Sequence, residues 1–225
     1  MLKDNNQKIY SVAHFSFFEK IALKKRIEMT NIIKKFLNDK NIQNILDVGS
    51  TEDDDNFSSN YIVKNLGNYK EFKSISDQVI KTNFFTHKLT KSITENFSEG
   101  EIKKFKSDLV ISNATIEHVG SFENQIKMCE NIIKLSNKYF IINTPSRFHP
   151  FEFHTKLPLL HWLPKKMYRT ILKLIGLNFF ADEKNLNLLS ENDLIFIMKK
   201  LKQVNFSIKK IKFLFFKSNL ILIGK

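Results

Sequence analysis

The sequence predicts an α/β fold in which helices cover both faces of a mostly parallel sheet, and three observations support this prediction. Apolar runs at residues 45–48, 108–113 and 139–142 have the length and composition of strands buried on both faces. A helical pattern of apolar residues, at 122–135, separates the last two runs. A strand, a helix and a strand joined by right-handed crossovers give a doubly wound parallel sheet. The length of 225 residues fits one such domain.

The composition excludes several classes of protein. Lys and Arg (36) exceed Asp and Glu (23), but the lysines are scattered along the chain, so we do not expect a nucleic-acid partner. A single cysteine, Cys129, excludes an internal disulfide and a cysteine-based metal site and favours a reducing cytoplasm. No apolar run reaches the ~20 residues that span a bilayer, and we expect no signal peptide.

The first strand lies between a helix and a polar turn. Residues 15–37 carry apolar side chains at helical spacing with a basic solvated face, within an N-terminal helical segment at 1–43. After the strand at 45–48, Gly49 permits a sharp bend and lets a ligand approach bare backbone. The acidic residues 52–55 favour a positively charged ligand over a phosphate.

The next segments continue the alternation of helix and strand. Residues 57–66 predict a short helix that stops at Gly67, and residues 72–77 predict the second strand. Residues 84–90 predict the third strand with its turn. Residues 91–106 have no clear apolar period, so we expect a surface loop with a short helix there.

The last part of the chain predicts two helices and a hairpin. Residues 164–177 form a basic amphipathic pattern, whose apolar side we expect to pack inward. A weak contact between its basic face and an anionic membrane surface is the alternative interpretation. Ser190 begins a capping-box-like helix start. Residues 206–216 and 219–223 predict an antiparallel hairpin that turns at 217–218.

The connection at residues 144–189 is long and aromatic, and we interpret it as a lid-like insertion within one domain spanning 1–225. It contains several polar groups, among them His149, Glu152 and His154. A metal site is the alternative interpretation. The spacing repeats no known ligand pattern and no cysteine takes part, so we expect no metal.

Three stretches carry a resemblance to a known family. Asp47-Val48-Gly49 matches the acid, variable residue and glycine that end a strand in its first motif, and residues 107–119 resemble its fourth strand with the following turn. The family is the class I S-adenosylmethionine-dependent methyltransferases. Residues 143–164 are similar to one bacterial branch of the type 11 members. The resemblance implies S-adenosylmethionine as cofactor and a three-layer Rossmann-like sheet of about seven strands with an antiparallel last strand.

The resemblance also implies the residues that bind the cofactor. They lie in the first turn and after the second and fourth strands: Asp47, Gly49, Ser50, Thr51, Asp77, Asn113 and Ala114. Asp77 would accept the ribose hydroxyls, with Glu71 as the fallback if the strand is placed differently. Asn113 and Ala114 would face the methionine end. Thr86 and His87 stand where relatives carry an acid for adenine, so that contact is unassigned.

The reaction needs a group that removes a proton from the acceptor. Histidine supplies a pKa near neutrality, and His154 is the leading candidate because Glu152 precedes it by two residues. The two side chains face one way if the segment is extended. His118, after the fourth strand, is the alternative base, and a cap or packed tip is the structural interpretation of that turn.

The predicted function is S-adenosylmethionine-dependent methyl transfer to a small-molecule or glycan-like acceptor. One alternative is a binding protein that has lost catalysis, because the first motif lacks further glycines and the third strand lacks its acid. RNA methylation is a second alternative, favoured by charge alone.

Overall fold

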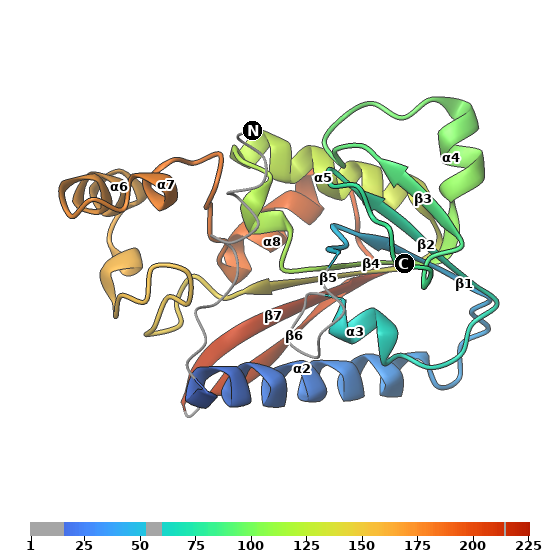
Figure 1. Cartoon of the computed structure of the whole chain (residues 1–225), viewed down its shortest axis with the longest axis horizontal. Coiled ribbons are helices and arrows are strands. Elements are labelled where there is room, and N and C mark those ends of the chain that lie inside the picture. Colours follow the sequence, from blue (N-terminus) through green and yellow to red (C-terminus); the bar gives the residue numbers. More distant parts are fainter. Residues whose placement is uncertain (1–15, 53–59, 214) are drawn as a thin grey trace.

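The centre of the molecule is a seven-stranded sheet in the order β3-β2-β1-β4-β5-β7-β6 (Figure 1). The computed structural model describes residues 16–52, 60–213 and 215–225. The strands are β1 (Asn44–Val48), β2 (Glu71–Ser76), β3 (His87–Thr90), β4 (Ser107–Asn113), β5 (Ser136–Pro145), β6 (Phe206–Phe213) and β7 (Phe216–Gly224). Strand β7 is antiparallel to β5 and β6, and the other neighbours are parallel. The predicted sheet with a reversed last strand is confirmed.

Helices lie on both faces of this sheet (Figure 1). They are α2 (Ser16–Leu37) and α3 (Tyr61–Lys64) on one face, and α4 (Glu99–Phe105), α5 (Phe122–Leu135) and α8 (Glu191–Lys200) on the other. Alternate residues of β1 enter different cores: Ile45 packs with Ile33 of α2, whereas Leu46 packs with Ile132 of α5. All four side chains have 0% exposure, so the central strands are apolar on both faces because both faces are covered.

Most predicted helices begin at the start signals that the sequence analysis identified. Helix α5 has the predicted bounds, and the side chain of Ser121 accepts a hydrogen bond from the backbone of Asn124 at its start. Ser190 caps α8 in a full capping box. Helix α4 is the short helix expected in the loop at 91–106. Residues 57–59 of the short helix predicted at 57–66 lie outside the described part of the chain.

Two strand predictions are wrong in their bounds. Strand β3 begins at His87, three residues later than predicted, because Phe85 packs into the core beside α2 with 2% exposure instead of joining the sheet. The hairpin turn does not lie at 217–218: both residues belong to β7. Ser218 is buried there and donates a hydrogen bond to the backbone oxygen of Ile211, so its hydroxyl is satisfied within the strand pair.

The connection between β5 and α8 carries η2 (Leu160–Trp162), α6 (Lys165–Leu174) and α7 (Asn178–Ala181), and in Figure 1 α6 and α7 lie beyond the end of β5. It has its own small core around Tyr168, Leu172 and Ala181. This core is separate from the two clusters that line the sheet. The segment after β5 is therefore a packed substructure.

The apolar side of α6 is more exposed than predicted. Leu172 is buried, but Met167, Leu174 and Ile175 are 52%, 79% and 51% exposed. Exposed Lys173 lies on the same helix, so the weak anionic-membrane contact stays a prediction. Cosedimentation with anionic vesicles tests it, and equal recovery with neutral vesicles would contradict it. Among the described residues, no helix is long and apolar enough to cross a membrane.

Candidate active site

The turn after β1 is held by side chains at the carboxyl ends of β1 and β2. The Ser50 hydroxyl donates to Asp47 Oδ2 at 2.6 Å and accepts from Ser74 Oγ at 2.9 Å. Ser76 Oγ donates to the Ser50 carbonyl at 2.8 Å. All four residues are buried. These bonds fix the turn that the sequence predicts as a cofactor site, and Ser74 and Ser76 are contributors that the sequence analysis missed.

The Asp47 carboxyl lies in this network, and no cation of the described residues is among its hydrogen-bond partners. Burial raises its pKa to about 7, although the hydrogen bond from Ser50 works in the opposite direction. A buried carboxylate is costly to ionise unless a positive charge approaches it. Asp47 is therefore placed to respond to a cationic ligand.

Gly49 is required by the protein's own packing. Its φ is +85°, and a Cβ there would overlap the Oγ1 and Cγ2 atoms of Thr115. Thr115 in turn donates to the carbonyls of Val48 and Asn113 at 3.3 and 3.2 Å. The loop after β4 fills the volume at this position, so a side chain at residue 49 would first collide with Thr115.

Thr51 is fixed by an asparagine that the sequence analysis did not single out. Its N–H donates to Asn60 Oδ1 at 3.0 Å, and Asn60 Nδ2 donates to its carbonyl at 2.6 Å. Asn60 is fully buried just before α3. The Glu52 carboxylate accepts from the N–H of Lys81 at 2.6 Å. The remaining acids of the predicted turn, at 53–55, lie outside the described residues.

Asp77 and Glu71 lie at opposite ends of β2. Asp77 follows the carboxyl end of the strand and is exposed at the edge of the sheet where β1 also ends. Glu71 begins the strand and lies 3.6 Å from His87 Nε2. The fallback assignment of the ribose contact to Glu71 is therefore wrong, because the strand begins there. Thr86 and His87 also lie at that far end, so the adenine contact stays unassigned.

The carboxyl end of β4 carries the predicted methionine-end residues. Asn113 is 8% exposed and pairs in register with Asn143 of β5. Ala114 is exposed and has a φ of +51°, while its N–H donates to the Asn143 carbonyl at 2.9 Å. A left-handed alanine is uncommon, and such strained backbone gathers at functional sites.

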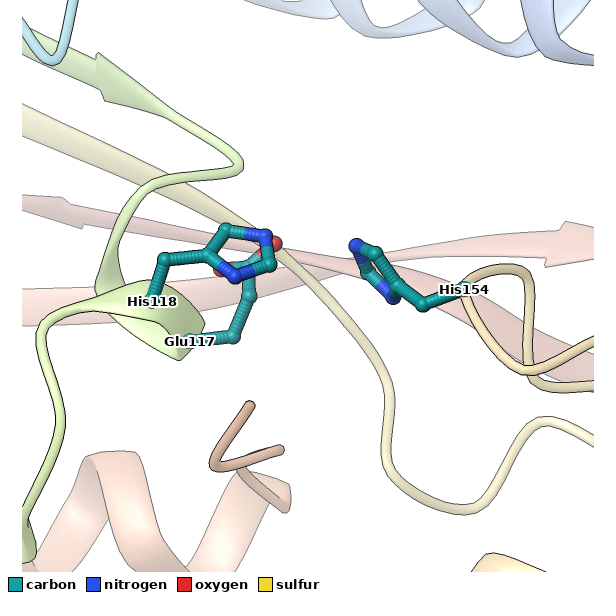
Figure 2. A group of neighbouring side chains, drawn as sticks. All are labelled: Glu117, His118 and His154. Atoms are coloured by element: carbon teal, nitrogen blue, oxygen red, sulfur yellow. The ribbon is translucent and has the colours of Figure 1, made fainter. Parts of the chain in front are cut away.

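A second cluster of polar side chains lies beside this edge, and its members come from two segments that are far apart in the sequence. Glu117 and His118 belong to η1 (Ile116–His118), and His154 comes from the connection after β5. Figure 2 shows the two imidazoles turned toward each other with the Glu117 carboxylate beside them. The ring centroids are 4.9 Å apart. We call these three residues the Glu-His-His cluster.

Glu152 orients His154. His154 Nδ1 donates to Glu152 Oε1 at 2.7 Å, and the backbone N–H groups of His154 and Thr155 donate to the same carboxylate at 2.9 and 2.6 Å. The segment is a turn, closed by the Lys156 N–H on the Glu152 carbonyl. The pair therefore meets through a turn and not through the extended segment considered in the sequence analysis.

Burial and these partners determine the charges in the cluster. Burial alone would raise the pKa of Glu152 and lower that of His154, but their hydrogen bond and mutual attraction dominate. The pKa of Glu152 falls to about 2, and that of His154 rises above its ordinary value. Burial also raises the pKa of Glu117 to about 7. Burial and the neighbouring His154 lower the pKa of His118 to about 3.

The other two members of the cluster are also anchored. His118 Nδ1 donates to the carbonyl of Asn185 at 2.7 Å. Glu117 Oε2 accepts from Thr144 Oγ1 at 3.0 Å, whereas Glu117 Oε1 is buried without a partner among the described residues. Glu117, Thr144 and Asn185 were not among the predicted site residues. Adjacency to His118 was a local signal for Glu117, but no local signal pointed to Thr144 or Asn185.

Comparisons with known proteins bear on the fold. No family model matches the chain, and no curated protein matches it. A solved S-adenosylmethionine-dependent methyltransferase from Archaeoglobus fulgidus is similar at 13% identity over 94% of this chain and 99% of its own, with a TM-score of 0.53. Magnesium protoporphyrin IX methyltransferase from Synechocystis, with bound S-adenosylhomocysteine, aligns at 15% identity over 99% and 94%, with a TM-score of 0.53.

A third solved structure, from Burkholderia thailandensis, is similar with a TM-score of 0.57 at 10% identity, over 99% of this chain and 86% of its own. It is a 1,6-didemethyltoxoflavin-N1-methyltransferase with that compound and S-adenosylhomocysteine bound. At such identities the likeness establishes a shared fold. The activity of this chain has to be argued from its own site.

Proposed function

We propose that this protein transfers a methyl group from S-adenosylmethionine to a small or glycan-like acceptor. The observation that carries the proposal is that the predicted cofactor turn at Gly49 and the Glu-His-His cluster lie beside the carboxyl ends of β1 and β4, two adjacent parallel strands. Ligands of open α/β sheets bind outside these ends. Two solved methyltransferases of this fold have small molecules named as their acceptors, which favours that class.

The residues at this edge suit the cofactor by their chemistry. Asp47 with Ser50 and Thr51 would form the turn against it, and Asp77 would accept the ribose hydroxyls. Asn113 and the strained Ala114 would face the methionine end. The buried Asp47 carboxyl would gain from an ammonium or sulfonium charge.

The Glu-His-His cluster would act on the methyl acceptor. Transfer from a sulfonium neutralises charge, so the protein has to position the acceptor, exclude water and take up one proton from it. His154 is the leading proton acceptor, Glu152 holds its ring, and His118 is the alternative. The packed connection at 144–189 would act as a lid within a single domain, and the buried Cys129 fits a cytoplasmic setting.

Calorimetry with S-adenosylhomocysteine, followed by turnover assays on small-molecule and glycan acceptors, tests this function. We expect binding and turnover. Absence of cofactor binding by the folded protein would contradict the proposal. Binding without turnover on any acceptor would favour a non-catalytic binding protein, and steeply salt-dependent RNA affinity with RNA methylation would favour the RNA alternative.

Asp77→Ala should weaken S-adenosylhomocysteine binding by about 30- to 1000-fold, because two charge-assisted hydrogen bonds to the ribose would be lost. The exposed position predicts an unchanged melting temperature. Glu71→Ala is the matched control, since it removes a carboxylate from the opposite end of the same strand. A loss below tenfold in calorimetry would move the ribose contact to backbone groups.

S-adenosylhomocysteine affinity should rise with pH up to about pH 7 and level off above it. The carboxyl of Asp47 has a pKa raised to about 7 by burial, so below that pH it must release its proton to meet the ammonium of the ligand. A single proton gives at most about tenfold in affinity per pH unit. Asp47→Asn should abolish the rise. A flat profile for the unaltered protein would place the ammonium away from Asp47.

A further inference from the structure

We propose that the Glu-His-His cluster binds a divalent transition-metal ion of the Zn²⁺ or Mn²⁺ class, with Glu117, His118 and His154 as its protein ligands. The sequence analysis expected no metal, because it considered spacing along the chain. The cluster forms in space from η1 and the turn after Glu152. A metal site here is a property of the chain's own residues and does not depend on methyl transfer.

The set of donor groups suits such an ion. Two imidazoles and one carboxylate leave coordination positions open for water or another ligand, as in catalytic zinc sites and in other two-histidine, one-carboxylate centres. One donor atom from each of Glu117, His118 and His154 lies within 4.8 Å of the other two. Metal–ligand bonds of about 2.1 Å place tetrahedral ligands roughly 3.4 Å apart. Small side-chain rotations toward the common centre would therefore complete the site.

The hydrogen-bond partners of the two imidazoles are of the kind found behind metal-ligating histidines. His154 donates from Nδ1 to Glu152 at 2.7 Å, and His118 donates from Nδ1 to the carbonyl of Asn185 at 2.7 Å. In metal sites the non-ligating ring nitrogen is bonded in this way to a carboxylate or carbonyl, which fixes the tautomer and the ring orientation. In Figure 2 the second nitrogen of each ring turns toward the space between the rings.

Glu117 supplies an independent observation. Its side chain has 0% exposure, and Oε1 has no hydrogen-bond partner in the part of the chain that is described. A buried carboxylate is costly when one of its oxygens accepts no hydrogen bond from the surrounding protein. A cation between Glu117 and the two imidazoles would compensate it. The hydrogen bond from Thr144 would then orient the other oxygen.

Metal binding is measured on the full chain, purified without a histidine tag and dialysed against a chelator. Calorimetric titrations use ZnCl₂ and MnCl₂, and Co²⁺ absorption reports the ligand geometry. The variants are Glu117→Gln, which keeps the hydrogen bond from Thr144, His154→Gln and the outer-shell Glu152→Gln. His87→Gln is the matched control, because it removes a partly exposed histidine at the far end of β2 and β3.

We expect one ion per chain and a higher melting temperature with the metal. Glu117→Gln and His154→Gln should lower the affinity at least 100-fold, Glu152→Gln about 10- to 100-fold, and His87→Gln should leave it unchanged. Absence of binding, or equal affinity in all folded variants, would overturn the proposal. If a variant does not fold, the test is the melting temperature of the unaltered protein with and without the metal. Absence of a metal-induced rise in that temperature would also overturn the proposal. No cofactor or acceptor is present, so either proposal can fail without the other.

Discussion

His154→Gln should lower kcat for methyl transfer by about 10²- to 10⁴-fold while S-adenosylhomocysteine affinity stays unchanged. The glutamine keeps size and hydrogen bonding but has no basic or metal-ligating imidazole nitrogen. The ring belongs to a cluster beside the predicted methionine end of the site, and Glu152 holds it at 2.7 Å. The loss is therefore expected whether the imidazole takes the acceptor proton directly or holds a cation that polarises the acceptor.

Steady-state turnover on the acceptor found by screening measures this effect, with calorimetry on the same preparations. His87→Gln is the control for loss of a histidine, because His87 lies at the other end of the parallel strands. Glu152→Gln should lower the rate only in part. The His154 ring would stay in position, but the glutamine would orient it less firmly than the carboxylate does. If His154→Gln keeps its rate and His118→Gln loses it, the catalytic group stands on the turn after β4.

The fold was predictable where local signals agree with burial. Helix α5 combines a serine cap at Ser121 with a continuous apolar stripe, and its bounds match the prediction. Phe85 shows the opposite case: an apolar run indicates burial, but burial in a packed connection satisfies it as well as a strand does. The turn between β6 and β7 was misplaced for the converse reason: Ser218 is polar, which suggests a turn, but its hydroxyl has a partner inside the strand pair.

The candidate site was predictable in part. The position of Asp77 follows from where β2 ends, and the same strand places Glu71 at the far edge. The Glu-His-His cluster could not be read as a unit, because η1 and the turn at Glu152 meet only when the connection after β5 folds back. Spacing along the chain carries no information on such a meeting.

Gly49→Val should abolish detectable S-adenosylhomocysteine binding. The φ of +85° is strained for any side chain, and the added atoms would push Thr115 from the carbonyls of Val48 and Asn113. The turn after β1 and the loop after β4 would then separate at the edge where the cofactor is proposed to bind. Calorimetry on the variant, with circular dichroism and melting temperature as checks of folding, measures the result.

Gly176→Val is the matched control for Gly49→Val. Gly176 has a φ of +81°, and a Cβ there meets no atom of the described residues within 4 Å, so the variant imposes the same backbone strain without the collision. It lies just after α6, away from the proposed cofactor edge, and should keep full affinity. Thr115→Ala provides a milder test of the same edge, because it removes both hydrogen bonds and leaves Gly49 intact. Unchanged affinity in folded Gly49→Val and in Thr115→Ala would remove the turn after β1 from the cofactor site.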